Sequence, residues 1–186
     1  MNDNENFLWE ESLENIVSDP KDFEQAANSL CEHALNDAKA QLHPLLRNVE
    51  LERLEKRSEF IQAFKQALEE RIAHKLAIWQ PGIQAVFQFE ESWMDSRRSW
   101  DGSVHLLVKV PGLSNRLKTL GRKLDRNLVN CLRQMGWSRF QKRRSILEIQ
   151  QVTPNEVRHA TGYGAMFCAA HNVPVKVWPQ GKKRSG

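Results

Sequence analysis

A dense run of cationic side chains occupies the stretch from Ser114 to Arg144 and is the part of this sequence best suited to chemistry. Ten of its 31 residues are Lys or Arg, and Asp125 is the one acid among them. Positive charge at this density favours a negatively charged ligand: a polyanion, an acidic partner surface or an acidic segment of the same chain. The cations are Arg116, Lys118, Arg122, Lys123, Arg126, Arg133, Arg139, Lys142, Arg143 and Arg144.

Two aromatic residues, Trp137 and Phe140, lie among the last of these cations. Phosphates supply affinity to basic side chains, and every base offers a face on which an aromatic ring can stack. The combination predicts a nucleic-acid-binding surface in which the ten cations contact phosphates and the two rings stack on bases. The alternative for the two aromatic residues is structural, because rings three residues apart can also anchor a turn in the hydrophobic core.

A helix from about Leu113 to Met135 is expected to present most of these cations. Its apolar residues recur at helical spacing and form one buried face, while its cations fall on a different arc. Arg122 and Arg126 sit four residues apart, where like charges repel, so ordinary helix stabilisation does not explain them. A merely solvated face stays open as the alternative. The apolar residues are Leu113, Leu117, Leu120, Leu124, Leu128, Cys131 and Met135.

Charge is divided between the two ends of the chain. Residues 1–110 carry 12 Lys/Arg and 20 Asp/Glu, whereas residues 111–186 carry 15 and 3. We expect an acidic helical region over residues 1–80, a basic α+β domain over 81–180 and a disordered basic tail over 181–186. The N-terminal helices could also support a homo-oligomer.

The acidic region is predicted to form two helices that pair antiparallel. The first begins at Asp19-Pro20 and ends near His43-Pro44, because proline suits the first helical position and breaks a helix interior. The second runs from about Val49 to Trp79 and is stopped by Pro81-Gly82.

Beyond Gly82 the apolar period changes from 3.6 toward 2, which is typical of strands. Strands are predicted near 83–90, 104–110, 146–152 and 173–178, and the apolar residues of the first are expected to share one buried face. The order after the two helices is therefore β-β-α-β-α-β. This order predicts an α+β fold with an N-terminal helical pair followed by a small mixed four-stranded sheet with two covering helices.

The segment before the last strand holds two weaker motifs. Thr153-Pro154-Asn155-Glu156 predicts a capping box at a helix start. A turn at Gly162 gives the outline of a helix-turn-helix, but the residues after it are nearly all apolar, which favours a core role or a close backbone approach.

Cys168 and His171 form one metal-type pair where a structural zinc site needs two, so we expect no metal and a buried thiol.

Three cysteines, Cys31, Cys131 and Cys168, are too few and too scattered for a disulfide framework and favour a reducing compartment. The first residues are polar and acidic, unlike a signal peptide, and no apolar run is long enough to span a membrane. We therefore expect a cytoplasmic protein with no membrane partner.

No catalytic signature stands out, so we expect a binding protein without a cofactor in preference to an enzyme. The leading hypothesis is an accessory or regulatory nucleic-acid-binding protein that contacts phosphates of DNA or RNA through its basic C-terminal half. The main alternative is a protein-protein interaction or assembly factor that docks an acidic partner surface. A metal-dependent nuclease is a third hypothesis, with an incomplete set of acids near strand ends: Glu90, Glu91, Asp95, Asp101 and Glu148.

Overall fold

The computed structural model describes residues 20–89, 102–169 and 173–179. Helices and a four-stranded mixed sheet follow one another in the expected order, which confirms the α+β fold. The predicted basic tail, 181–186, lies outside the described residues. The elements are α2 (Pro20–Gln41), the 3-10 turn η1 (Pro44–Leu46), α3 (Leu51–Leu54), α4 (Ser58–Trp79), β1 (Ala85–Gln88), β2 (Val104–Lys109), α5 (Asn115–Gln134), η2 (Ser138–Phe140), β3 (Leu147–Val152), α6 (Pro154–His159), η3 (Gly162–Cys168) and β4 (Val175–Trp178).

The sheet has the strand order β3-β2-β1-β4. β1 is antiparallel to both β2 and β4, whereas β2 and β3 are parallel, in register from Val104 opposite Leu147 to Lys109 opposite Val152. Parallel neighbours need a crossover connection, and α5 supplies it. The cationic helix is thus built into the topology of the sheet.

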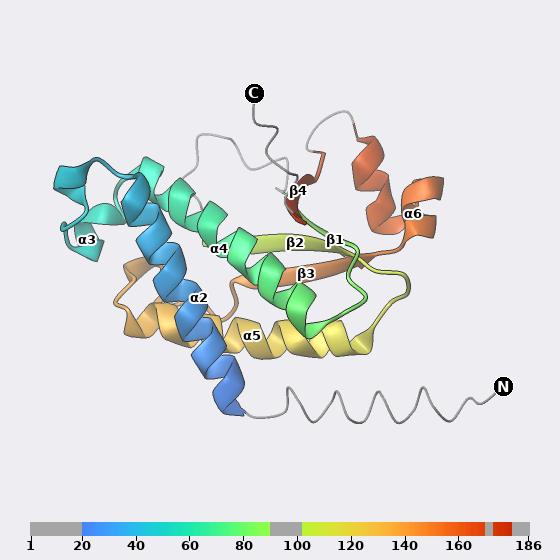
Figure 1. Ribbon diagram of the computed structural model, residues 1–186, viewed down its shortest axis with the longest axis horizontal. Helices are drawn as coiled ribbons and strands as arrows, with labels where there is room; N and C mark the ends of the chain where they lie inside the picture. The colour runs from blue at the N-terminus through green and yellow to red at the C-terminus, as the bar shows by residue number, and fades with distance from the viewer. Residues whose placement is uncertain (1–19, 90–101, 170–172, 180–186) are drawn as a thin grey trace.

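Three long helices cover one face of the sheet. α4 and α5 pack against the strands, and α2 crosses both of them, as Figure 1 shows. One hydrophobic cluster joins residues of all these layers, among them Phe23 of α2, Phe64 of α4, Leu106 of β2 and Leu124 of α5. The N-terminal helices and the sheet therefore share a core.

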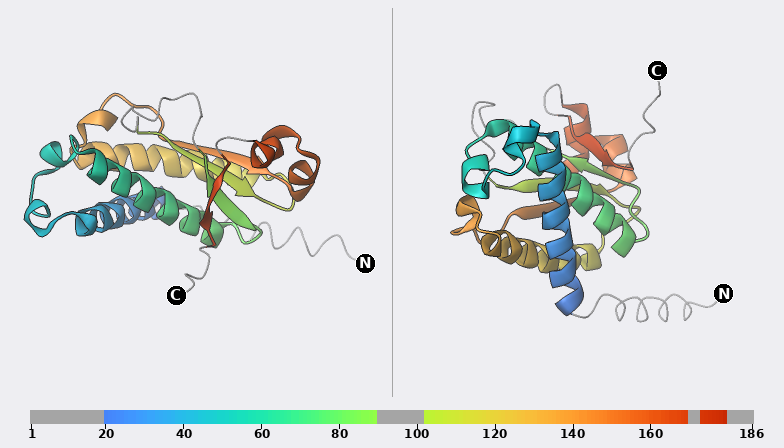
Figure 2. Two further views of the ribbon diagram at one scale, coloured as in Figure 1. Left: turned by 90° about the horizontal axis from the view of Figure 1, so that it is seen from above. Right: turned by 60° about the vertical axis from the view of Figure 1, so that its left-hand side comes forward.

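The opposite face of the sheet packs on α6 and η3. Phe89, Leu107 and Val152 form a smaller cluster there, and the rings of Phe87 and Phe167 meet edge to face at 4.8 Å. Figure 2 shows α6 and η3 set apart from the three long helices. Among the described residues no helix is long and apolar enough to cross a membrane.

The structure corrects the expectation that the apolar residues of the first strand share one face. Ile83, which was expected to share a face with Phe87 and Phe89, is buried with Val86 in the main core, while Phe87 and Phe89 lie in the cluster beside α6 and η3. The pairing of β1 with β4 is irregular between Val86 and Phe87. The strand is therefore covered on both faces, and simple alternation did not describe it.

Two predicted helices differ in detail from those of the structure. The helix expected from Val49 to Trp79 is broken between α3 and α4, where Arg57 adopts an extended backbone with φ −98° and ψ 119°. The cationic helix starts two residues later than expected because Ser114 caps it, its side chain accepting a hydrogen bond from the backbone N–H of Leu117. Leu113 consequently lies before the helix and is 67% exposed, outside the apolar face assigned to it.

The segment around Gly162 does not form a pair of α-helices. α6 begins with the predicted capping box and ends at His159; Ala160 follows it with a left-handed φ of 50°, and the apolar stretch after it forms the 3-10 helix η3. A Cβ on Gly164 would lie 2.1 Å from the backbone oxygen of Glu156, so glycine permits this close approach. The helix-turn-helix outline is thus replaced by packing against the sheet.

Candidate nucleic-acid interface

The outer side of α5 carries a row of exposed cations. Lys118, Arg122 and Arg126 are all exposed and follow one another at four-residue intervals, which places them about 6 Å apart along one side of the helix. Lys123 is exposed beside them, with its Nζ 5.4 Å from the centre of the Phe23 ring of α2. We call these four residues the α5 row.

The inner side of α5 fixes the row in place. Leu117, Leu124 and Leu128 are completely buried against the core. A Cβ on Gly121 would lie 2.8 Å from the side chain of Ile149, so the helix approaches β3 closely at this turn. Such packing holds the cations on a rigid element instead of on a loop.

Asp125, the one acid of the basic stretch, is used by the fold. Its Oδ1 accepts hydrogen bonds from the backbone N–H groups of Ile146 and Leu147, both at 2.8 Å. These bonds tie the middle of α5 to the start of β3. The carboxylate therefore faces the sheet connection and forms no ion pair with the α5 row among the described residues.

Arg133 joins α5 to the basic segment that follows it. Its Nε donates to the backbone oxygen of Phe140 at 3.2 Å, and its Nη2 donates to the backbone oxygen of Arg143. Lys142 and Arg144 flank the second of these carbonyls and are exposed. Two groups of exposed cations, the α5 row and the pair Lys142 and Arg144, are thus fastened to one another.

Glu55 holds the same segment from the other side. Its carboxylate accepts hydrogen bonds from Ser138 N at 3.1 Å, Ser138 Oγ at 2.9 Å and Arg139 N at 3.4 Å, and the residue is only 7% exposed. Arg139 in turn donates to the backbone oxygen of Glu55 at 3.0 Å. An anion at the start of the η2 turn stabilises its unpaired amide groups.

The ten predicted cations divide into two groups. Six are exposed: Lys118, Arg122, Lys123, Arg126, Lys142 and Arg144. The other four, Arg116, Arg133, Arg139 and Arg143, are half-buried. Arg116 bonds to the backbone oxygen of Trp79, and Arg143 bonds to Ser103 Oγ at 2.9 Å. All four make bonds within the fold and are only partly accessible, and their contact with phosphates stays a prediction.

Trp137 and Phe140 lie in the core, which corrects their assignment as stacking platforms. Both are 0% exposed, and the Trp137 ring lies 5.8 Å from the Phe60 ring and 4.4 Å from the Phe64 ring. Burial against α4 leaves neither ring a face for a base. The two rings instead anchor the turn after α5 in the hydrophobic core, which was the alternative to base stacking.

The net charge of the described residues is strongly positive. Residues 20–89 and 102–110 carry ten acids and ten Lys/Arg, so the N-terminal half of the folded body is balanced. Residues 111–169 and 173–179 carry 12 Lys/Arg and three acids. Acids of the N-terminal helices pair with bases of the same helices, as Asp37 does with Arg71 and Glu69 with Lys65. The N-terminal helices therefore do not cancel the charge of the α5 row.

The acids named for a nuclease do not assemble into a metal site within the described residues. Glu148 accepts a hydrogen bond from His105 Nδ1 at 3.2 Å, beside Phe89 on the face of the sheet that packs on α6 and η3. Glu90, Glu91, Asp95 and Asp101 lie outside the described residues. In the described ranges no three His, Cys, Asp or Glu side chains are grouped to hold a metal ion.

The cysteines differ from one another in environment. Cys168 is exposed, against the expectation of a buried thiol, and its suggested partner His171 lies outside the described residues. Cys31 of α2 and Cys131 of α5 are buried. A hydrogen bond with Cys131, together with burial, raises the pKa of the Cys31 thiol well above its usual range. These two thiols belong to the interface between α2 and α5.

Sequence reasoning missed a cleft of about 470 Å³ between α2, α4 and β4. Ser29, His33, Arg71, Lys75 and Trp178 are among its lining residues. Arg71 is paired there with Asp37, and Glu70 also lines the cleft, so its acids and bases are balanced. A cleft without an excess of positive charge gives no preference for a polyanion.

No protein-family model, curated protein or solved structure matches this chain.

Proposed function

We propose that this protein is an accessory or regulatory nucleic-acid-binding protein, and that it contacts phosphates through the α5 row together with Lys142 and Arg144. The observation that carries the proposal is the pair of hydrogen bonds from Arg133 to the carbonyls of Phe140 and Arg143, which fastens the two cationic groups together. A row of cations on a rigid element suits a regularly charged backbone, because the cations need no reordering when they bind.

The chemistry of the surface supports binding through charge and gives little basis for reading bases. Phosphate contacts position a protein on nucleic acid, whereas base-edge or stacking contacts provide sequence preference. With Trp137 and Phe140 buried, the proposed contact residues are six Lys or Arg side chains and include no aromatic ring. We therefore expect similar affinity for unrelated sequences.

The strength of binding is expected to fall steeply with salt. Each neutralised phosphate releases condensed counterions, which gives a slope of log affinity against log salt of about −0.9 per phosphate on duplex DNA and about −0.7 on single strands. Neutralisation of about six phosphates would give a slope of about −5 on duplex DNA. A smaller number of neutralised phosphates would lower the slope in proportion.

The test is a fluorescence-anisotropy titration with the full chain. Two unrelated sequences are each prepared as duplex DNA, duplex RNA and single-stranded DNA, and every form is titrated at about 50 and about 200 mM salt. We expect binding at low salt, equal within a few-fold for the two sequences of each type, and a loss of more than tenfold at the higher salt. Absence of binding at low salt, or affinity unchanged by salt, would contradict the proposal and leave an acidic protein partner as the ligand of this surface.

A further inference from the structure

The acidic excess of the N-terminal half is concentrated outside the described residues. Residues 1–19 contain six acids and no Lys or Arg, whereas the described part of the N-terminal half is balanced. The six acids are Asp3, Glu5, Glu10, Glu11, Glu14 and Asp19. The described residues carry an excess of positive charge, so this negatively charged segment is a candidate ligand for the α5 row.

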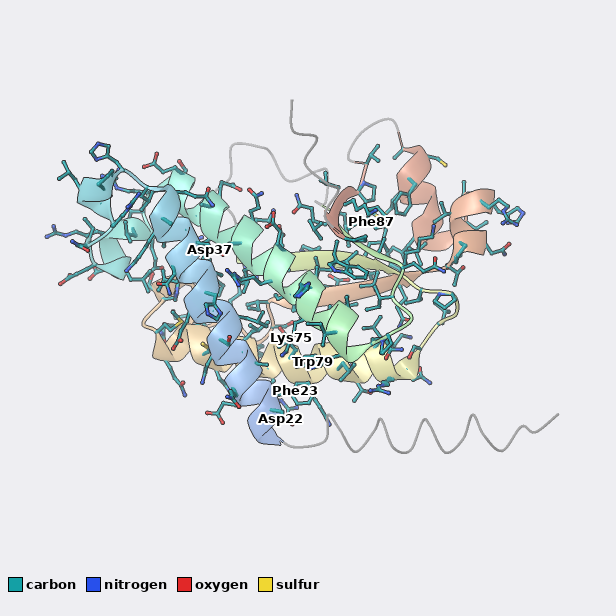
Figure 3. All side chains as sticks on the ribbon, viewed as in Figure 1. Asp22, Phe23, Asp37, Lys75, Trp79 and Phe87 are labelled. Atoms are coloured by element: carbon teal, nitrogen blue, oxygen red, sulfur yellow. The ribbon has the colours of Figure 1, made fainter. Side chains whose placement is uncertain are left out.

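The acidic segment is joined to α2, whose first turns lie beside the α5 row. It precedes α2, and Phe23 in the first turns of α2 lies under Lys123 of the α5 row, 5.4 Å from ring centre to Nζ. The Phe23 ring also packs at 5.0 Å on Trp79 at the end of α4, where both are labelled in Figure 3. These contacts fix the start of α2 at the edge of the α5 row.

The length of the segment is sufficient to cover the row in any regular conformation. α5 has 20 residues and is therefore about 30 Å long. Nineteen residues span about 28 Å as a helix and about 60 Å when extended. From the start of α2, residues 1–19 can reach Lys118, Arg122 and Arg126 without rearrangement of the body.

We propose that the acidic segment, residues 3–19, docks on the α5 row of its own chain and competes there with nucleic acid. The competition rests on the proposed function, whereas the docking itself does not. A short tether gives an attached ligand an effective concentration in the millimolar range, so weak ion pairs suffice for occupancy. Because the docking is made by surface charges, salt screens it.

The first test looks for the docked segment directly in the full chain without nucleic acid. A carbodiimide joins carboxylates to lysine amines that touch them, so it reports ion pairs. We expect crosslinks in the monomer between Glu10, Glu11 or Glu14 and Lys118 or Lys123, identified by mass spectrometry and abolished in about 1 M salt, where the Debye length is about 3 Å. Crosslinks from the segment only to other surfaces, or only between two chains, would overturn the proposal.

The second test uses two triple variants with the same change of net charge. The variant Glu10→Gln/Glu11→Gln/Glu14→Gln removes acids of the segment, and Glu50→Gln/Glu52→Gln/Glu59→Gln removes three exposed acids of the α3 and α4 region. At low salt the first is expected to bind duplex DNA about fivefold more tightly than the parent, a coupling of ordinary size for competing ligands. The second should differ from the parent by less than about twofold, the effect of net charge alone.

The two tests separate the failure of this inference from the failure of the proposed function. If the parent binds nucleic acid but forms no crosslinks to Lys118 or Lys123, and both variants bind equally, the docking is wrong and the function stands. If the crosslinks form but neither the parent nor the variants bind nucleic acid, the function and the competition are wrong and the docking stands.

Discussion

Asp125 accepts hydrogen bonds from the backbone N–H of Ile146 and of its neighbour Leu147, each at 2.8 Å. The bond to Ile146 joins residues 21 positions apart. Together the two bonds tie α5 to the start of β3, the strand that pairs in parallel with β2. The one acid inside the basic stretch therefore serves the fold. Its position explains how a helix can present a row of like charges and still be held firmly.

Replacement of Asp125 by alanine is expected to destabilise the protein by about 1–3 kcal/mol, because two part-buried backbone N–H groups lose their acceptor. Chemical denaturation measures the change. Asp125→Asn keeps an acceptor oxygen and is the control, for which we expect a smaller destabilisation. Equal stability of the alanine variant and the parent would show that these bonds contribute nothing.

The apolar face of α5 is tested at Leu124, which is completely buried. Leu124→Ala should lower the free energy of unfolding by about 2–5 kcal/mol through reduced burial and the cavity left behind. Arg122→Ala, two residues away on the exposed side, should change it by no more than about 0.5 kcal/mol. Similar destabilisation by the two variants would mean that the faces of the helix are assigned wrongly.

The amphipathic pattern made this helix predictable from sequence. Leu117, Leu120, Leu124 and Leu128 recur at helical spacing, and all four are buried as that spacing indicates. The order of strands and helices was equally accessible, because each is marked by its own period or by Pro and Gly. Local signals of this kind determine the elements of the fold.

The roles of individual site residues depended on tertiary interactions that no local pattern records. Glu55 meets Ser138 across 83 positions, and neither residue belongs to a motif. Trp137 looked like a stacking residue because its neighbours in sequence are cationic, yet its neighbours in space are Phe60 and Phe64 of α4. Arg133 was predicted to lie on the outward arc of the helix and Arg139 in the basic segment after it, yet both are half-buried and donate to backbone carbonyls.

Arg133 is predicted to act by positioning the segment that carries Lys142 and Arg144. Arg133→Lys keeps the charge but removes the forked donation to two carbonyls, so it should cost about 1.5–3 kcal/mol of stability and reduce nucleic-acid affinity several-fold in the folded protein. Arg126→Lys, at an exposed position, should retain both. Hydrogen exchange is expected to increase over residues 141–145 in the Arg133 variant alone. Unchanged exchange and affinity would remove the positioning role.

The three thiols are predicted to react with iodoacetamide in a fixed order. Cys168 is exposed and should be alkylated first, because the reagent reaches it without opening of the fold. Cys31 should react last, because it is buried, and burial together with its hydrogen bond to Cys131 raises the pKa of its thiol well above the usual range. Mass spectrometry assigns the labels. Labelling of Cys31 at the rate of Cys168 in the folded protein would contradict the packing of α2 on α5.

The central claim is that phosphates bind the α5 row, and a pair of matched double reversals tests it most directly. Arg122→Glu/Arg126→Glu changes the row, whereas Arg158→Glu/Lys176→Glu makes the same change of charge at exposed positions on α6 and β4. For the first variant we predict weaker binding of all sequences to a similar extent and a salt slope shallower by about two units, one for each phosphate that is no longer neutralised. The second variant should keep the slope of the parent. Equal slopes for the two variants and the parent, or an equal weakening of binding in the two variants, would contradict the assignment of nucleic-acid binding to this helix.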